Sequence, residues 1–249
     1  MKDFLQAIEK IPRHLREGYW SPVSIFYLFA YFGFLVHTYP YAMSSVRDIM
    51  EPQLEYEHGI NMFRAIAAVW GVIVLAGVVY ASGWWPLVSY TLTSWNLLWM
   101  RMIFAALDMK FVARIFKPPS LVGCTITVTI WWTILVPLMH NLMNDKVKQA
   151  SFWKFNTSFL LINVHLVNLP IAAIEFYYSA SKLVFFDLWI ALSIAFAYMI
   201  FYLGVLDANG IHLYIILTPR THLCIISYSL ILSMYYTCYT QWNSIIKGY

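Results

Sequence analysis

Seven long apolar stretches fill most of this chain and leave it few ways to fold. A helix needs about 20 consecutive apolar residues to cross the hydrocarbon core of a bilayer. The stretches are continuously apolar and do not alternate, which favours helices over the strands of a membrane barrel. The predicted spans are Pro22–Ala42, Asn61–Val79, Pro86–Leu107, Pro119–His140, Phe155–Ser179, Leu183–Val205 and Thr221–Gln241.

Composition supports the same fold class. Hydrophobic residues make up 61% of the 249 residues and charged residues only 11%, against about 25% charged residues in soluble domains. The sequence therefore predicts an all-α, polytopic helical membrane protein. The net charge of +4 is too small to indicate a nucleic-acid partner. Membrane lipids are the expected partners of the apolar spans.

The N-terminal segment, residues 1–20, differs from the rest of the chain. Its apolar residues recur at helical spacing with charges between them, at Phe4, Leu5, Ile8, Ile11 and Leu15. This pattern predicts an amphipathic segment lying in the membrane interface, and a docking segment for a partner subunit is the open alternative. Residues 21–249 are expected to form a single transmembrane helical domain, because no linker, repeat or low-complexity tract interrupts them.

Common catalytic and metal-binding motifs are missing from the sequence. There is no G-x-S-x-G elbow, no Walker loop, no H-E-x-x-H pair and no C-x-x-C. The seven histidines include no pair spaced i, i+4, and all three cysteines fall inside predicted spans. No cofactor and no metal site are therefore expected.

Arg101, Glu175 and Asp187 are charged residues inside the third, fifth and sixth predicted spans, and Arg64 lies at the start of the second. A charge in hydrocarbon is costly unless it is paired, and such residues generally face other helices. The third and fifth spans run in the same direction, so their far ends and the start of the sixth span share one membrane face. We predict that Arg101 pairs with Glu175 or Asp187 as a structural ion pair.

Two further polar residues lie at matched depth near the opposite face. Thr93 is seven residues past Pro86, which is about 10 Å. His165 is ten residues past Phe155, which is about 15 Å. A threonine hydroxyl becomes a nucleophile when a neighbouring base accepts its proton, and imidazole is the commonest such base. Alternatively, Thr93 bonds a carbonyl of its own helix, and His165 joins two helices by a hydrogen bond.

Three short motifs carry a resemblance to a known family. The segment His165-Leu-Val-Asn-Leu-Pro170-Ile-Ala-Ala-Ile-Glu175 resembles the His, Leu-Pro and Glu spacing of the androgen-induced-gene family of multi-pass membrane hydrolases. Thr-Leu-Thr93-Ser-Trp-Asn-Leu-Leu, followed by Phe104, is similar to that family's threonine-bearing helix. Asn209-Gly210-Ile-His212-Leu-Tyr214 is similar to its Gly-x-x-x-Tyr segment, and the whole resemblance covers roughly residues 63–242.

The resemblance implies a fold and a function. Members of the family split fatty acid esters of hydroxy fatty acids, with threonine as nucleophile and histidine as base, so Thr93 and His165 would take these roles. They are expected to face a common cavity that an apolar tunnel joins to lipid. The span Pro22–Ala42 has no counterpart in the family and is expected to lie outside a family-like bundle of six helices.

Departures from the family pattern support an alternative function. Leu206 and Asp207 stand where a pair of histidines is typical, and Ile215 replaces a proline. The chain is then a non-catalytic accessory subunit of a large membrane complex that has kept the fold. Either function implies an integral membrane protein, in the mitochondrial inner membrane or the endoplasmic reticulum, and both stay open at this point.

Overall fold

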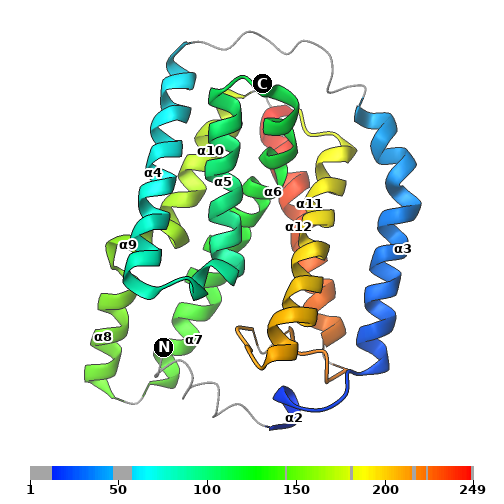
Figure 1. The fold of residues 1–249 in the computed structure, drawn as a ribbon, viewed down its shortest axis with the longest axis vertical. Helices are drawn as coiled ribbons and strands as arrows, with labels where there is room; N and C mark the ends of the chain where they lie inside the picture. Colours follow the sequence, from blue (N-terminus) through cyan, green and yellow to red (C-terminus); the bar gives the residue numbers. More distant parts are fainter. Residues whose placement is uncertain are drawn as a thin grey trace. The chain divides into compact units, whose positions relative to one another are not determined.

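The computed structural model describes residues 13–46, 58–143, 145–179, 182–214, 217–222 and 224–247. Within these ranges the regular structure is entirely helical, which confirms the all-α fold class (Figure 1). Most of the predicted interfacial segment, up to residue 12, lies outside the described residues. Its described end holds the short helix α2, Arg13–Arg16, beside a surface ion pair between Arg13 and Glu17.

Five helical rods of the described chain are long and apolar enough to cross a membrane, so the chain has the architecture of an integral, multi-pass membrane protein. Some rods combine several helices: α6 (Lys110–Thr129) runs into α7 (Val136–Leu142), α9 (Phe159–Ile162) into α10 (Asn168–Tyr178), and α11 (Phe185–Phe201) is extended to Asn209. The five rods are Pro22–Ser45, Ile60–Ser82, Lys110–Asn141, Phe159–Tyr178 and Phe185–Asn209.

The other two predicted spans form helices of a different character. The third begins late, because Pro86 lies in a short 3₁₀ turn and Ser89 caps α5, Tyr90–Ala106, by accepting a hydrogen bond from Leu92. At 17 residues α5 is shorter than a typical span. The last helix, α12 (Cys224–Lys247), has 24 residues but is rich in Ser, Thr and Tyr. A count of seven transmembrane helices therefore stays a prediction.

The fourth span is longer than the sequence indicates. Proline usually begins a helix, because it has no N–H to donate to the preceding turn. Here α6 begins at Lys110, so that Pro118 and Pro119 lie inside it. Both prolines are buried, as are Lys117 directly before them and Arg114 one turn earlier.

The chain divides into two compact units. One comprises residues 1–51 and 184–240, and the other comprises residues 52–183 and 241–249. The first contains α3, Pro22–Ser45, together with α11 and most of α12. The second contains α4 (His58–Ser82), α5, α6, α7, α8 (Lys146–Asn156), α9 and α10. That residues 21–249 form one transmembrane domain stays a prediction. The same holds for the place of the first span outside a six-helix bundle.

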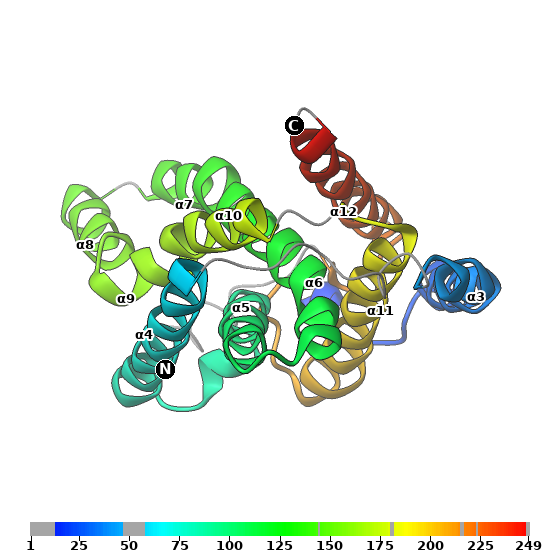
Figure 2. The ribbon, with the colours of Figure 1, turned by 90° about the horizontal axis from the view of Figure 1, so that it is seen from above.

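Within the first unit α3 lies beside α11 (Figures 1 and 2). Leu28, Tyr31 and Leu35 recur at i, i+3 and i+7 and are buried. The Tyr31 hydroxyl donates to the carbonyl of Leu192 at 2.7 Å, and the Trp189 indole donates to the carbonyl of Leu35 at 3.0 Å. The Phe186 backbone N–H of α11 donates to the Ser45 hydroxyl of α3 at 2.9 Å, so α3 is fixed to α11 by packing and by hydrogen bonds.

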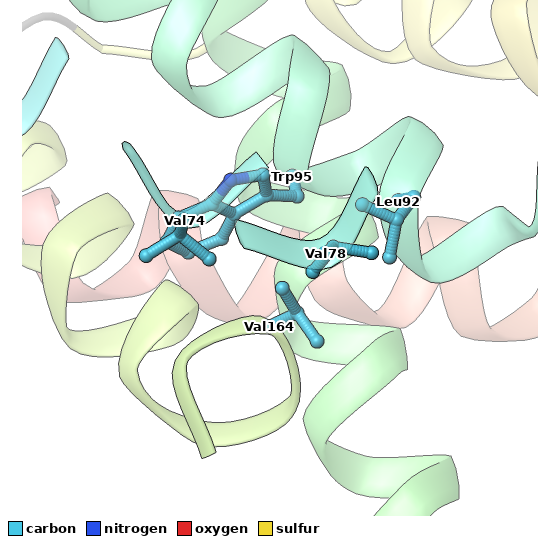
Figure 3. Packing of buried hydrophobic residues seen from close by; sticks show 5 residues of the cluster. All are labelled: Val74, Val78, Leu92, Trp95 and Val164. Atoms are coloured by element: carbon cyan, nitrogen blue, oxygen red, sulfur yellow. The ribbon is translucent and has the colours of Figure 1, made fainter. Parts of the chain in front are cut away.

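Within the second unit α5 lies between α4 and α6 (Figures 1 and 2). Its apolar core joins α4, α5 and the segment around Val164, as Figure 3 shows. The Trp95 indole, at the centre, also donates to the Gly71 carbonyl at 3.1 Å. The core consists of Val74, Val78, Leu92, Trp95 and Val164.

Close helix contacts in this unit depend on glycine. A Cβ on Gly71 of α4 would overlap the side chain of Trp99 on α5. A Cβ on Gly123 of α6 would come within 2.6 Å of the Ser94 hydroxyl on α5. Small residues allow helices in a bilayer to approach closely.

Gly71→Ala should therefore destabilise the protein by about 1–3 kcal/mol through overpacking, with a lower melting temperature in detergent. The matched control is Gly33→Ala on α3, where no atom lies within 4 Å of the new methyl group. There the gain in helix propensity should leave the melting temperature unchanged or raised. Equal effects of the two changes would contradict the close approach of α4 and α5.

Candidate functional site

Two helical rods of the second unit widen into π-helical turns, at Ile130–Leu135 and at Asn163–Val167. Each turn is followed by a proline, Pro137 or Pro170. A proline donates no hydrogen bond to the carbonyl four residues earlier and crowds it, so a regular α-turn is disfavoured there. π-Helical turns are frequent at functional sites.

The two π-helical turns meet at His165, which is 7% exposed. The indole of Trp131 stacks on the imidazole with the ring centroids 3.8 Å apart. The indole nitrogen of the next residue, Trp132, donates to the His165 carbonyl at 2.8 Å. The first turn therefore holds both the ring and the backbone of the histidine.

The two ring nitrogens of His165 have different partners. Nδ1 lies 3.2 Å from the carbonyl oxygen of Leu161. A carbonyl only accepts, so Nδ1 carries the proton in this bond. In the neutral ring, Nε2 is then an acceptor, and it lies 3.4 Å from the hydroxyl oxygen of Thr91 on α5. We call Thr91, Trp131, Trp132, His165 and the Leu161 carbonyl the His165 site.

Thr93, the predicted nucleophile, has another partner. Its hydroxyl donates to the Ser89 carbonyl at 2.9 Å, within its own helix. In the described part of the chain no hydrogen bond joins Thr93 to His165. Residues two apart on an α-helix point about 200° apart, so Thr91 contacts His165 while Thr93 of the same helix points elsewhere. The roles of Thr93 as nucleophile and of His165 as base stay predictions. The predicted common cavity and lipid tunnel stay predictions.

The third motif of the resemblance belongs to the first unit. Asp207 is 3% exposed and lies 2.8 Å from Nδ1 of His212 and 2.8 Å from Arg220. The Tyr202 hydroxyl accepts a hydrogen bond from the Tyr214 backbone N–H at 2.9 Å. Sequence reasoning missed this network, although an acid and a histidine five residues apart in one loop were a usable signal.

The predicted partner of Arg101 is confirmed. Its guanidinium lies 2.5 Å from Oε1 of Glu175, deep in the second unit. Arg64, which the sequence placed only at the start of a span, also binds this carboxylate, at 2.9 Å and 3.0 Å. Asp187, the alternative partner, accepts a hydrogen bond from the backbone of Val184 and so caps α11 in the first unit.

Comparison with known proteins adds no assignment: no protein-family model, curated protein or solved structure matches this chain. Among the described residues, no group of three or more His, Cys, Asp or Glu side chains is arranged to hold a metal ion.

Glu175→Gln should destabilise the protein more than Arg101→Leu. Glu175 binds two arginines, whereas removal of Arg101 leaves the ion pair between Glu175 and Arg64 in place. Breaking a buried ion pair costs about 3–5 kcal/mol, so both variants should give less folded protein after mild heating in detergent. The control is Glu17→Gln at the exposed pair with Arg13, which should leave the yield unchanged. A larger loss for Arg101→Leu than for Glu175→Gln would contradict the central place of the carboxylate.

Proposed function

We propose that this multi-pass membrane protein hydrolyses lipid esters, with Thr91 as nucleophile and His165 as its base. The 3.4 Å contact between the Thr91 hydroxyl and Nε2 of His165 carries the proposal. A working base comes within about 2.6–3.2 Å of the oxygen that it activates, and sites without substrate are often looser. In such sites a third group orients the base, and here the Leu161 carbonyl, which accepts from Nδ1 of His165, would take that role.

The chemistry follows from these positions. The Thr91 oxygen bonds to the carbonyl carbon of the ester while its proton passes to Nε2 of His165. The ester C–O bond then breaks, and the alcohol leaves with that proton. Water next attacks the acyl-threonine and gives a proton to His165, and the acyl–oxygen bond breaks as Thr91 recovers the proton. The products are a fatty acid and an alcohol.

The proposed substrates are fatty acid esters, such as fatty acid esters of hydroxy fatty acids. Their acyl chains dissolve in the bilayer and would reach a site between helices from the lipid side. His165 lies within the rod Phe159–Tyr178, which is long and apolar enough to span a membrane. The resemblance of the His165, Pro170 and Glu175 segment to the androgen-induced-gene family supports the same substrate class.

A fluorophosphonate probe in lipid nanodiscs tests the assignment. Wild-type protein should be labelled, and Thr91→Ala should abolish labelling, because the nucleophilic oxygen is removed. His165→Gln should slow labelling by about 10²–10⁴, the usual contribution of a general base. The matched control Thr93→Ala loses a hydroxyl from the same helix and should keep the label. Loss of label in Thr93→Ala but not in Thr91→Ala would return the nucleophile to Thr93.

A specific observation favours the second candidate function, a non-catalytic accessory subunit of a large complex in the mitochondrial inner membrane. The hydroxyl of Thr93, which the resemblance assigns as nucleophile, donates to its own helix. An accessory subunit should leave wild-type membranes only with a much larger assembly on a native gel, and should show no labelling. A free, labelled protein of about its own mass would exclude this candidate.

A further inference from the structure

A series of side-chain contacts leads from the end of α8 to Thr91. Asn156 ends α8, Trp131 lies in the first π-helical turn, His165 in the second, and Thr91 near the start of α5. We infer that Asn156 and Trp131 are positioning residues, which hold His165 in the orientation and tautomer that direct Nε2 at Thr91. The inference rests on the proposed function and names two residues that act through the base.

The series begins at an amide whose orientation is fixed. Asn156 is 0% exposed. Its nitrogen donates to the Phe152 carbonyl at 2.8 Å, and its oxygen accepts from the Trp131 indole nitrogen at 3.1 Å. Rotation of the amide by 180° would set two donors against each other at Trp131 and two acceptors at Phe152. The Trp131 ring is therefore held in its plane by a directional bond as well as by packing.

The anchored indole in turn limits the imidazole. The two rings stack with 24° between their planes. The movement of the imidazole that keeps this stack is a half-turn about the Cβ–Cγ bond of His165. A half-turn would place ring carbons against the Leu161 carbonyl and the Thr91 hydroxyl, and both hydrogen bonds would be lost. The hydrogen bond from Trp132 to the His165 carbonyl also restricts movement of the backbone that carries the ring.

The stack also suits the charged state that the reaction passes through. When Nε2 accepts the proton of Thr91, the ring becomes an imidazolium. The face of an indole attracts a cation, most strongly where water is excluded. Among the described residues no charged side chain forms an ion pair with His165. Trp131 therefore supplies the local stabilisation that a carboxylate supplies in the usual triad.

The spectroscopic test reads the tautomer directly. Protein with ¹⁵N-labelled histidine in nanodiscs should show a single neutral form of His165, protonated at Nδ1, and His165→Gln identifies its signals. Trp131→Leu and Asn156→Ala should both give a mixture of the two tautomers, whereas Trp131→Phe keeps a stacking ring and should stay closer to wild type. The control Asn96→Ala breaks an equivalent bond, from the Trp99 indole at 3.0 Å, away from the stack. It should leave the His165 signals unchanged.

Labelling rates separate this inference from the proposed function. A misplaced base should slow fluorophosphonate labelling in Trp131→Leu and Asn156→Ala by up to about a hundredfold, with little change in Asn96→Ala. An unchanged tautomer in both variants would overturn the inference even if wild-type protein is labelled. If the two variants show a mixture of tautomers but wild-type protein is never labelled, the positioning role of Asn156 and Trp131 stands and the proposed hydrolase is overturned.

Discussion

The carboxylate of Glu175 joins three helices of the second unit through ion pairs. Arg64 reaches it from α4 and Arg101 from α5, and Glu175 itself lies on α10. The side chains of all three are almost completely buried, and a charge inside a membrane protein is tolerated only where it is paired. The apolar core of Val74, Trp95 and Val164 lies on α4, on α5 and in the π-helical turn of the rod Phe159–Tyr178, which also contains α10. The positions of Thr91 and His165 therefore depend on a bundle that this carboxylate locks.

The His165 site is built from departures from regular α-helix. The π-helical turns at Ile130–Leu135 and Asn163–Val167 lie in two neighbouring rods, and the contacts between these rods are made from the turns themselves. The Trp132 indole donates to the His165 carbonyl, and the Trp131 indole stacks on the His165 ring. The prolines that follow each turn give a local physical reason for the widening. The residues of these turns thus pair the His165 imidazole with the Trp131 indole and the His165 carbonyl with the Trp132 indole.

The proposed hydrolase and the proposed accessory subunit differ in what the His165 site does. For a hydrolase, the bond from Leu161, the stack on Trp131 and the contact with Thr91 together orient a base. For an accessory subunit, the same contacts only join helices, as hydrogen-bonding side chains commonly do in bilayers. Labelling that depends on Thr91 distinguishes the two, because no structural role requires a reactive oxygen.

The sequence by itself determined the helical membrane class, the approximate rods and the pairing of Arg101 with an acid, either Glu175 or Asp187; the structure selects Glu175. These follow from local composition and from the cost of an unpaired charge in hydrocarbon, which need no knowledge of neighbours. It also placed the segment Thr91–Thr93 at a depth close to that of His165. Only the tertiary structure decided that Thr91 contacts the imidazole and that Thr93 bonds its own helix, because two residues on one turn share a depth but not a face. The contacts of Arg64 with Glu175 and of Asn156 with Trp131 have the same physical reason. The partner of a buried polar group depends on how the helices rotate and pack against one another, and the order of residues along one helix does not contain this information.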